Sequence, residues 1–255
     1  MHILLVGLGN MGNKYFWKLE QMGEKLVLCD IDPSKERKPY PFYCHFGEVK
    51  EELRGVIVAV DPKDHPTIAK EFLEKGIPVL LEKPPALSSK DFEDIKEYKG
   101  LYVSEVESYS LCTEYLKKPE KHLRIERLGR GKGYISPLWD LAWHDLYLLQ
   151  RISKDIKIQG LHKKDSLWTL MGYLEEVPFT LTVAWEHPNP KRVWHVDNDL
   201  ILDFGEEKVY KDGKLLREGK RDKLALMVED FLKGSFDRDS VERAYINLKL
   251  LESAS

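Results

Sequence analysis

A short apolar run that ends in a glycine-rich turn opens the chain and restricts its fold more than any other feature. Ile3 to Val6 are apolar, the sequence GLGNMG follows at once, and apolar residues then recur with helical spacing as far as Met22. This order predicts a strand, a turn and a helix. The turn matches the GxGxxG spacing that cradles a pyrophosphate at a helix N-terminus. The expected dinucleotide contacts in the turn are Gly7, Gly9, Asn10, Met11 and Gly12.

An acidic residue ends the second predicted strand. This strand runs from Lys25 to Cys29, and Asp30 follows it, 18 residues after Gly12. At this spacing a carboxylate hydrogen-bonds the adenosine ribose hydroxyls and repels a 2′-phosphate, so we expect NAD rather than NADP, with Ile31 beside the cofactor. The alternative is a solvated strand-end residue before a turn.

The next 75 residues alternate between buried strand patterns and helix patterns. Apolar or β-branched runs at 55–60, 78–81 and 102–104 predict strands, and 65–75 and 88–98 predict helices, with Ser88 or Ser89 as N-cap. Such alternation predicts a Rossmann-type doubly wound parallel sheet. We place this NAD-binding domain at residues 1–105 and a second domain at 106–255.

The stretch from Val56 to Ser88 resembles the Gfo/Idh/MocA family of sugar-type dehydrogenases, including glucose-fructose oxidoreductase and inositol dehydrogenase. The resemblance depends on the EKP motif at Glu82, Lys83 and Pro84. It implies that Lys83 is an active-site lysine, and an ammonium there would stabilise negative charge on the reacting oxygen. A surface lysine at a strand end is the alternative.

The resemblance also implies that His65 lies near the cofactor, although a helix-start residue is an equal alternative. At the ends of these strands, the further expected cofactor contacts are Val60, Asp61, His65, Glu82 and Lys83.

Residues 137–152 have helical spacing and carry a second pattern, DxxxHD. Asp140 and His144 are four residues apart, which places them on one helix face. The pattern resembles the second marker of the same family, which implies that His144 is the general acid/base and that Asp140 orients it or the substrate. A core histidine beside a capping aspartate is the alternative. Trp139, Trp143 and Tyr147 predict core packing more often than a sugar-stacking platform.

Residues 121–133 alternate apolar and polar side chains and then form a basic, glycine-rich loop containing Arg130. The loop could bind an anionic substrate, and a solvated edge strand with its loop is at least as good an interpretation.

The second domain is expected to be an α/β domain with an open, mostly antiparallel sheet. Residues 179–185 alternate apolar and polar side chains, residues 197–199 predict a turn between antiparallel strands, and helices are expected near 223–232 and 239–252. From the family resemblance we expect a homo-oligomer, a dimer or tetramer, formed through this sheet at the face of Trp185.

Composition favours a small-molecule substrate over nucleic acid or a membrane. The net charge is −3, and no apolar run approaches the ~20 residues that span a bilayer. With no basic or apolar leader, a cytoplasmic location is expected. Cys29, Cys44 and Cys112 lack zinc-site spacing, so we expect reduced, buried thiols and no metal. Abundant Lys and Glu favour heat adaptation, which a mesophilic melting temperature would contradict.

These features predict an NAD-dependent dehydrogenase acting on a CH–OH group. The expected hydride transfer joins nicotinamide to a secondary alcohol or ketone of a sugar, cyclitol or nucleotide-linked sugar. Two alternatives stay open: an NAD-dependent amino- or imino-acid dehydrogenase, and a non-catalytic sensor that binds NAD.

Overall fold

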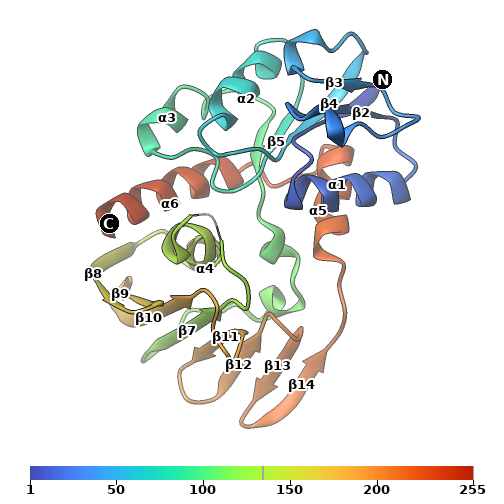
Figure 1. Cartoon of the computed structure of the whole chain (residues 1–255). Coiled ribbons are helices and arrows are strands. Elements are labelled where there is room, and N and C mark those ends of the chain that lie inside the picture. The colour runs from blue at the N-terminus through green and yellow to red at the C-terminus, as the bar shows by residue number, and fades with distance from the viewer. Residues whose placement is uncertain (134, 255) are drawn as a thin grey trace. The chain divides into compact units, whose positions relative to one another are not determined.

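The computed structural model describes residues 1–133 and 135–254, which form two compact units (Figure 1). The first unit contains Met1–Ser104 and Leu224–Tyr245, and the second contains Glu105–Lys223 and the chain from Ile246 onward. The sequence placed the functional boundary after residue 105. That assignment of functions stays a prediction, and the packing adds a C-terminal segment to the first unit.

A six-stranded parallel sheet forms the centre of the first unit, in the order β3-β2-β1-β4-β5-β6. Its strands are β1 (His2–Val6), β2 (Leu26–Cys29), β3 (Phe42–Tyr43), β4 (Leu53–Val58), β5 (Val79–Leu81) and β6 (Leu101–Val103). The helices are α1 (Asn10–Gln21), α2 (His65–Leu73), α3 (Ser89–Glu93), α5 (Lys223–Lys233) and the start of α6 (Ser240–Ala254).

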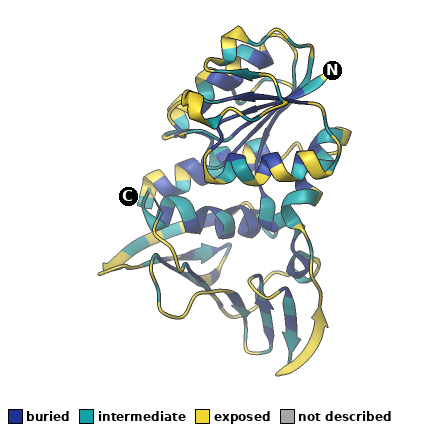
Figure 2. Cartoon of the chain, turned by 45° about the vertical axis from the view of Figure 1, so that its right-hand side comes forward, coloured by how far each residue is buried: buried dark blue, intermediate teal, exposed yellow. Residues whose placement is uncertain are grey.

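Helices lie on both faces of this sheet, α2 and α3 on one side and α1 and α5 on the other (Figure 1). This explains why the inner strands are continuous apolar runs, drawn as buried in Figure 2. The doubly wound Rossmann architecture predicted from the sequence is confirmed.

Two elements of the first unit differ from the sequence expectation. The helix expected over 88–98 ends at Glu93, because Ile95 N–H already bonds the Phe92 carbonyl three residues back. Its expected N-cap is present, since the Ser88 side chain accepts the Asp91 N–H. Strand β3 was not predicted, because two residues are too few to carry a periodic pattern.

The second unit is built on an eight-stranded, mostly antiparallel sheet in the order β14-β13-β12-β11-β7-β10-β9-β8. Its strands are β7 (Leu123–Leu128), β8 (Ile156–Lys164), β9 (Leu167–Leu174), β10 (Val177–Ala184), β11 (Lys191–Val196), β12 (Leu200–Asp203), β13 (Lys208–Lys211) and β14 (Lys214–Glu218). The predicted α/β class and mostly antiparallel sheet are confirmed.

Strand β7 corrects the edge-strand interpretation of residues 121–133. It lies inside the sheet, parallel to β10 on one side and antiparallel to β11 on the other. Leu123 and Ile125 are buried, and Arg127 on the same face is buried with them. Only the residues after Leu128 form an exposed loop.

Helix α4 (Trp143–Gln150) covers part of this sheet (Figure 1), and a π-helical turn (Leu138–Ala142) precedes it. Trp143 and Tyr147 are each 1 % exposed. Core packing is therefore confirmed for Trp143 and Tyr147, whereas Trp139, in the π-helical turn, is only part-buried.

The cysteine prediction was partly wrong. Cys29 and Cys112 are buried, but Cys44 is exposed because it follows the two-residue strand β3 into a surface turn. Among the helices that the structure describes, none is long and apolar enough to cross a membrane.

Candidate functional site

The glycine turn between β1 and α1 is tight because two of its glycines have no room for a side chain. Gly7 has φ of +90°, and a Cβ there would lie 2.5 Å from the Ala59 carbonyl oxygen. A Cβ on Gly12 would lie 1.8 Å from the Gly7 carbonyl oxygen. The turn thus brings the start of α1 close against the ends of β1 and β4.

Gly9 differs from these two glycines in a way that suits a phosphate group. It is exposed, it is the N-cap residue of α1, and a Cβ built on it would meet nothing within 4 Å. The first turn of α1 has no acidic residue. Open space at a helix N-terminus without a competing carboxylate fits a pyrophosphate, so the residues present fit a dinucleotide.

The Asp30 carboxylate is held beside this turn by two backbone donors. Leu8 N–H donates to Oδ2 at 2.7 Å and Asp32 N–H donates to Oδ1 at 3.0 Å. The first bond ties the end of β2 to the glycine turn. Ile31, the next residue, is 89 % exposed. Asp30 is thus fixed where the sequence expects a ribose-binding carboxylate, and not freely solvated.

The strand order reverses between β1 and β4, which is where open α/β sheets bind ligands. Val60 follows β4, and its Cγ1 would lie 2.7 Å from a Cβ on Gly7. Asp61 Oδ1 accepts the Lys63 N–H at 3.1 Å and so closes the turn after this strand. Both residues therefore lie at the carboxyl edge of the sheet with the glycine turn.

Glu82 links the EKP segment to the nucleotide-binding helix. Tyr15, on α1, donates its hydroxyl to Glu82 Oε1 at 2.5 Å, and Lys83 N–H donates to Oε2 at 3.1 Å. Glu82 and Tyr15 are buried. Burial and the adjacent Glu82 raise the pKa of Tyr15 well above its usual range. The phenol therefore stays protonated and donates, which fixes the backbone that carries Lys83.

His65, the first residue of α2, is completely buried. Its Nδ1 lies 3.0 Å from the Pro84 carbonyl oxygen, which can only accept, so Nδ1 carries a hydrogen. Burial lowers the pKa of His65 to about 4. The neutral ring thus ties α2 to the EKP segment, which is a positioning contact and agrees with both sequence interpretations.

In the second unit, His144 is the one side chain of α4 that is not buried. The helix is fixed on either side of it. The Asp145 carboxylate accepts two bonds from Arg127, at 2.7 and 3.0 Å, and one from Trp194 Nε1 at 2.8 Å. Asn247 Nδ2 donates to the Trp143 carbonyl at 3.0 Å. Asp145 of the DxxxHD pattern is thus structural, and it holds the helix that presents His144.

A buried network of ion pairs holds α4 against strand β7. Arg127 Nη1 lies 3.1 Å from the Glu107 carboxylate, which Lys223 and Arg192 also contact, at 2.7 and 3.2 Å. Arg127 and Glu107 are each about 2 % exposed. Because several cations and carboxylates compensate one another, this charge can be buried, and its geometry fixes β7 against α4.

Asp140 lies in the π-helical turn before α4, next to the basic loop. A Cβ on Gly133 would lie 3.1 Å from Asp140 Oδ2 and 2.3 Å from the Trp185 ring. Trp185 Nε1 also donates to the Ile135 carbonyl at 3.3 Å. The loop therefore packs on Trp185, whose ring is half-buried within its own unit, and Asp140 lies beside the loop.

The first part of the chain is similar to a known protein family. Residues 1–101 match the Gfo/Idh/MocA model, described as an oxidoreductase family with an NAD-binding Rossmann fold. This part of the chain is therefore similar to the Gfo/Idh/MocA family. The resemblance carried by the EKP motif is thereby confirmed, and the NAD-binding Rossmann oxidoreductase assignment with it. A search of curated protein sequences finds no match.

Solved structures with this fold cover both units. UDP-N-acetylglucosamine 3-dehydrogenase GnnA from Acidithiobacillus ferrooxidans is 19 % identical, with a TM-score of 0.83 over 100 % of this chain and 97 % of its own. A putative oxidoreductase from Magnetospirillum magnetotacticum is 18 % identical, with a TM-score of 0.82 over 100 % and 99 %. An Agrobacterium radiobacter oxidoreductase in complex with NAD+, L-tartaric acid and magnesium is 13 % identical, with a TM-score of 0.77 over 100 % and 95 %.

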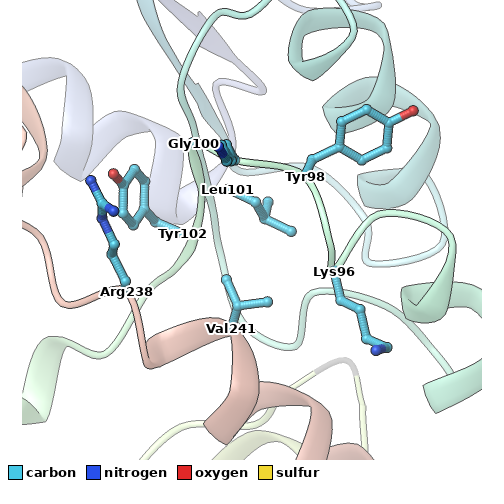
Figure 3. A pocket seen from close by; sticks show the side chains of 8 residues that line it. Lys96, Tyr98, Gly100, Leu101, Tyr102, Arg238 and Val241 are labelled. Carbon is cyan, nitrogen blue, oxygen red and sulfur yellow. The ribbon is translucent and has the colours of Figure 1, made fainter.

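A hollow of about 390 Å³ lies elsewhere in the first unit (Figure 3). It is lined by Lys96, Tyr98, Lys99, Gly100, Leu101, Tyr102, Arg238 and Val241. These residues surround the start of β6, which is the amino edge of the parallel sheet, whereas the glycine turn, Asp30 and Lys83 lie at its carboxyl edge. The hollow is therefore not part of the candidate nucleotide site. Across residues 1–133 and 135–254, no group of three or more His, Cys, Asp or Glu could hold a metal ion.

Sequence reasoning missed two tyrosines at these sites. Tyr15 contacts Glu82 across 67 residues, and Tyr147 contacts the backbone of Glu107 across 40. Both tyrosines fit ordinary apolar helix periodicity, so the pattern predicts core packing. Nothing in the local sequence indicates that the Tyr15 hydroxyl contacts Glu82 or that the Tyr147 hydroxyl contacts His144, because hydroxyl contacts are set by the folded structure.

Proposed function

We propose that this protein is an NAD-dependent dehydrogenase that transfers a hydride between nicotinamide and a secondary alcohol or ketone. The observation that carries the proposal is the open position of Gly9 at the N-terminus of α1, with the clamped Asp30 carboxylate beside it. When bound, the nicotinamide supplies the hydride donor or acceptor. The chain's own residues bind the dinucleotide, orient the substrate and stabilise charge on its reacting oxygen.

Asp30 is the basis for proposing NAD rather than NADP. Both of its oxygens already accept backbone N–H bonds, which hold the carboxylate in place with lone pairs to spare for ribose hydroxyls. A 2′-phosphate at the same position would meet a fixed negative charge.

Lys83 is proposed as the cation that stabilises charge on the reacting oxygen. It follows β5 at the carboxyl edge of the sheet, and its backbone is held by Glu82, which Tyr15 fixes in turn. An ammonium held in place beforehand stabilises a developing alkoxide without reorganisation. His65, through Pro84, supports the other side of the same segment.

His144 is proposed as the group that hydrogen-bonds the substrate's reacting oxygen, with Asp140 as an orienting carboxylate. The supporting observation is that His144 is partly accessible, whereas all the remaining side chains of α4 are buried. A helix fixed by Arg127 and Trp194 holds such a group with little freedom.

A nucleotide-linked sugar is the proposed substrate class within the wider set of sugars and cyclitols. Arg130 and Lys132 are exposed on the loop that packs beside Asp140, and within the described chain neither has an ion-pair partner. Two cations of this kind suit a diphosphate. GnnA, which shares the fold, is named for a UDP-linked sugar. On this proposal Arg130→Ala raises KM for a nucleotide-linked sugar and leaves KM for a neutral polyol unchanged.

The test is turnover across a panel of UDP-sugars, sugars, cyclitols and amino acids, followed at the absorbance of reduced nicotinamide. We expect turnover on a sugar-type alcohol, a loss of about 100-fold in kcat for Lys83→Ala, and NAD affinity nearly unchanged. Lys90→Ala, an exposed lysine near by in sequence, is the control. Turnover only on amino acids would support the amino-acid alternative, and NAD binding without turnover would support the sensor.

A further inference from the structure

Tyr147 contacts His144 from the next turn of α4. Its Oη lies 3.2 Å from His144 Nδ1, with the two rings edge to face at 75°. The same Oη accepts the Glu107 backbone N–H at 2.9 Å. We infer that Tyr147 is a positioning residue that holds neutral His144 in the tautomer with its proton on Nε2.

The argument depends on counting hydrogens at one oxygen. A phenol has a single hydrogen to donate, and Glu107 N–H already uses Oη as an acceptor. Among the residues that the structure describes, His144 Nδ1 is the one acceptor in hydrogen-bonding contact with this hydroxyl. A neutral imidazole that accepts at Nδ1 carries its hydrogen at Nε2.

The opposite arrangement is unfavourable at this position. If His144 donated from Nδ1, Oη would accept two hydrogen bonds and its own hydrogen would have no acceptor in a buried setting. A tyrosinate would remove that difficulty, but burial and the Glu107 and Glu105 carboxylates raise the pKa of Tyr147 well above its usual range. The hydroxyl therefore keeps its hydrogen and donates it.

The consequence for chemistry rests on the proposed function. With the proton on Nε2, neutral His144 offers the reacting oxygen a hydrogen-bond donor. A nitrogen that already carries a hydrogen cannot take the alcohol's proton. On this proposal the Lys83 ammonium gives a proton to the oxygen when a ketone accepts the hydride, and the Lys83 amine takes that proton back when the alcohol is oxidised. His144 then stabilises charge on oxygen as a donor, unlike the general acid/base role that the family resemblance implies.

Nitrogen-15 NMR of the histidine-labelled full chain tests the tautomer without any substrate. The His144 signals are assigned from their loss in His144→Gln. In the unmodified protein we expect a protonated Nε2 and an unprotonated, hydrogen-bonded Nδ1. A proton on Nδ1 would overturn the inference. This reading needs no Tyr147 variant, so it holds even if such a variant fails to fold.

Tyr147→Phe tests the cause, because it keeps the buried ring and removes only the hydroxyl. We expect the Nδ1–H tautomer of His144 to gain population in this variant. Tyr102→Phe, a buried tyrosine packed on Phe231 and Phe236 in the other unit, is the matched control and leaves the His144 signals unchanged. An unchanged tautomer in folded Tyr147→Phe would overturn the positioning role.

Once a substrate is found, His144→Gln and His144→Ala separate donation from proton exchange. Glutamine can donate an N–H but cannot exchange a proton near neutral pH. We expect His144→Ala to lose about 100-fold in kcat and His144→Gln to recover to within about tenfold of the unmodified enzyme. Equal losses in the two variants would overturn the donor role. If the whole panel gives no turnover, the proposed function fails, and the NMR result still decides the tautomer.

Discussion

Glu82 and Asp30 are acidic residues at the same edge of the parallel sheet, and their surroundings give them different tasks. Glu82 is buried and accepts from Tyr15 and from the Lys83 backbone, so its bonds are internal. Asp30 is only part-buried, and its backbone bonds hold it near the glycine turn. The first carboxylate therefore positions the chain, and the second is available to a ligand.

Asp30→Asn keeps the shape of this side chain and removes its charge. We expect NAD affinity to fall about tenfold, which is ~1.4 kcal/mol. NADP affinity should stay the same or rise, because the repulsion of a 2′-phosphate is gone. Calorimetric titration of NAD and of NADP into the unmodified chain and into Asp30→Asn measures the ratio of the two affinities in each protein. The same ratio in the two proteins would contradict the assignment of Asp30 to the ribose.

At the scale of elements, α1 begins at the glycine turn and α4 carries His144, and the two helices are held in place differently. Helix α1 approaches its strand through glycines, whereas α4 is held by hydrogen bonds from Arg127, Trp194 and Asn247. The sequence predicted α1 because glycine spacing is a local signal. It could not predict what holds α4, because each partner lies far from that helix in the chain.

Gly12→Ala tests the close approach of α1. Its Cβ would sit 1.8 Å from the Gly7 carbonyl oxygen, so the helix must move. Overpacking of this kind costs ~1–3 kcal/mol, more than the ~1 kcal/mol that alanine gains over glycine within a helix. We expect a lower urea midpoint for Gly12→Ala than for the exposed control Lys14→Ala on the same helix. Equal midpoints in the two variants would contradict the close contact between Gly12 and the Gly7 carbonyl oxygen.

At the scale of the whole molecule, the fold class, the parallel sheet and the mostly antiparallel second sheet could be predicted from periodicity and motif order. Strand β3 and the early end of α3 could not, because neither leaves a periodic trace. The internal place of β7 escaped prediction for another reason. Its alternating charged side chains are typical of a solvated strand, and Arg127 can be buried only because Asp145 and Glu107, distant in sequence, pair with it.

The Glu107 network predicts how the second unit responds to acid. Burial alone would raise the pKa of Glu107, but Arg127, Lys223 and Arg192 outweigh it and lower the pKa from 4.5 to about 2. Because the pKa of Glu107 is lower in the folded chain than in the unfolded chain, its ionised carboxylate stabilises the fold. This contribution to the free energy of unfolding is complete above pH 4.5 and is lost as the pH falls from 4.5 to about 2. The difference corresponds to ~3 kcal/mol.

Unfolding in urea at several acidic pH values measures this loss, followed by tryptophan fluorescence. Five of the six tryptophans lie in the second unit, so the signal reports mainly on it. We expect Glu107→Gln to be less stable than the unmodified chain at neutral pH and to lose less on acidification. A parallel decline of the two proteins would place the acid sensitivity in other groups.

Calorimetric titration of NAD into the unmodified chain and into Gly9→Ala tests the central claim most directly. The alanine methyl would enter open space, so folding is unaffected, but it would occupy the room left for a pyrophosphate. We predict one binding site per chain, an affinity at least about tenfold weaker in Gly9→Ala, and normal binding in Gly131→Ala, whose added methyl also meets open space. Absence of binding to the unmodified chain, or equal binding to Gly9→Ala, would contradict the account.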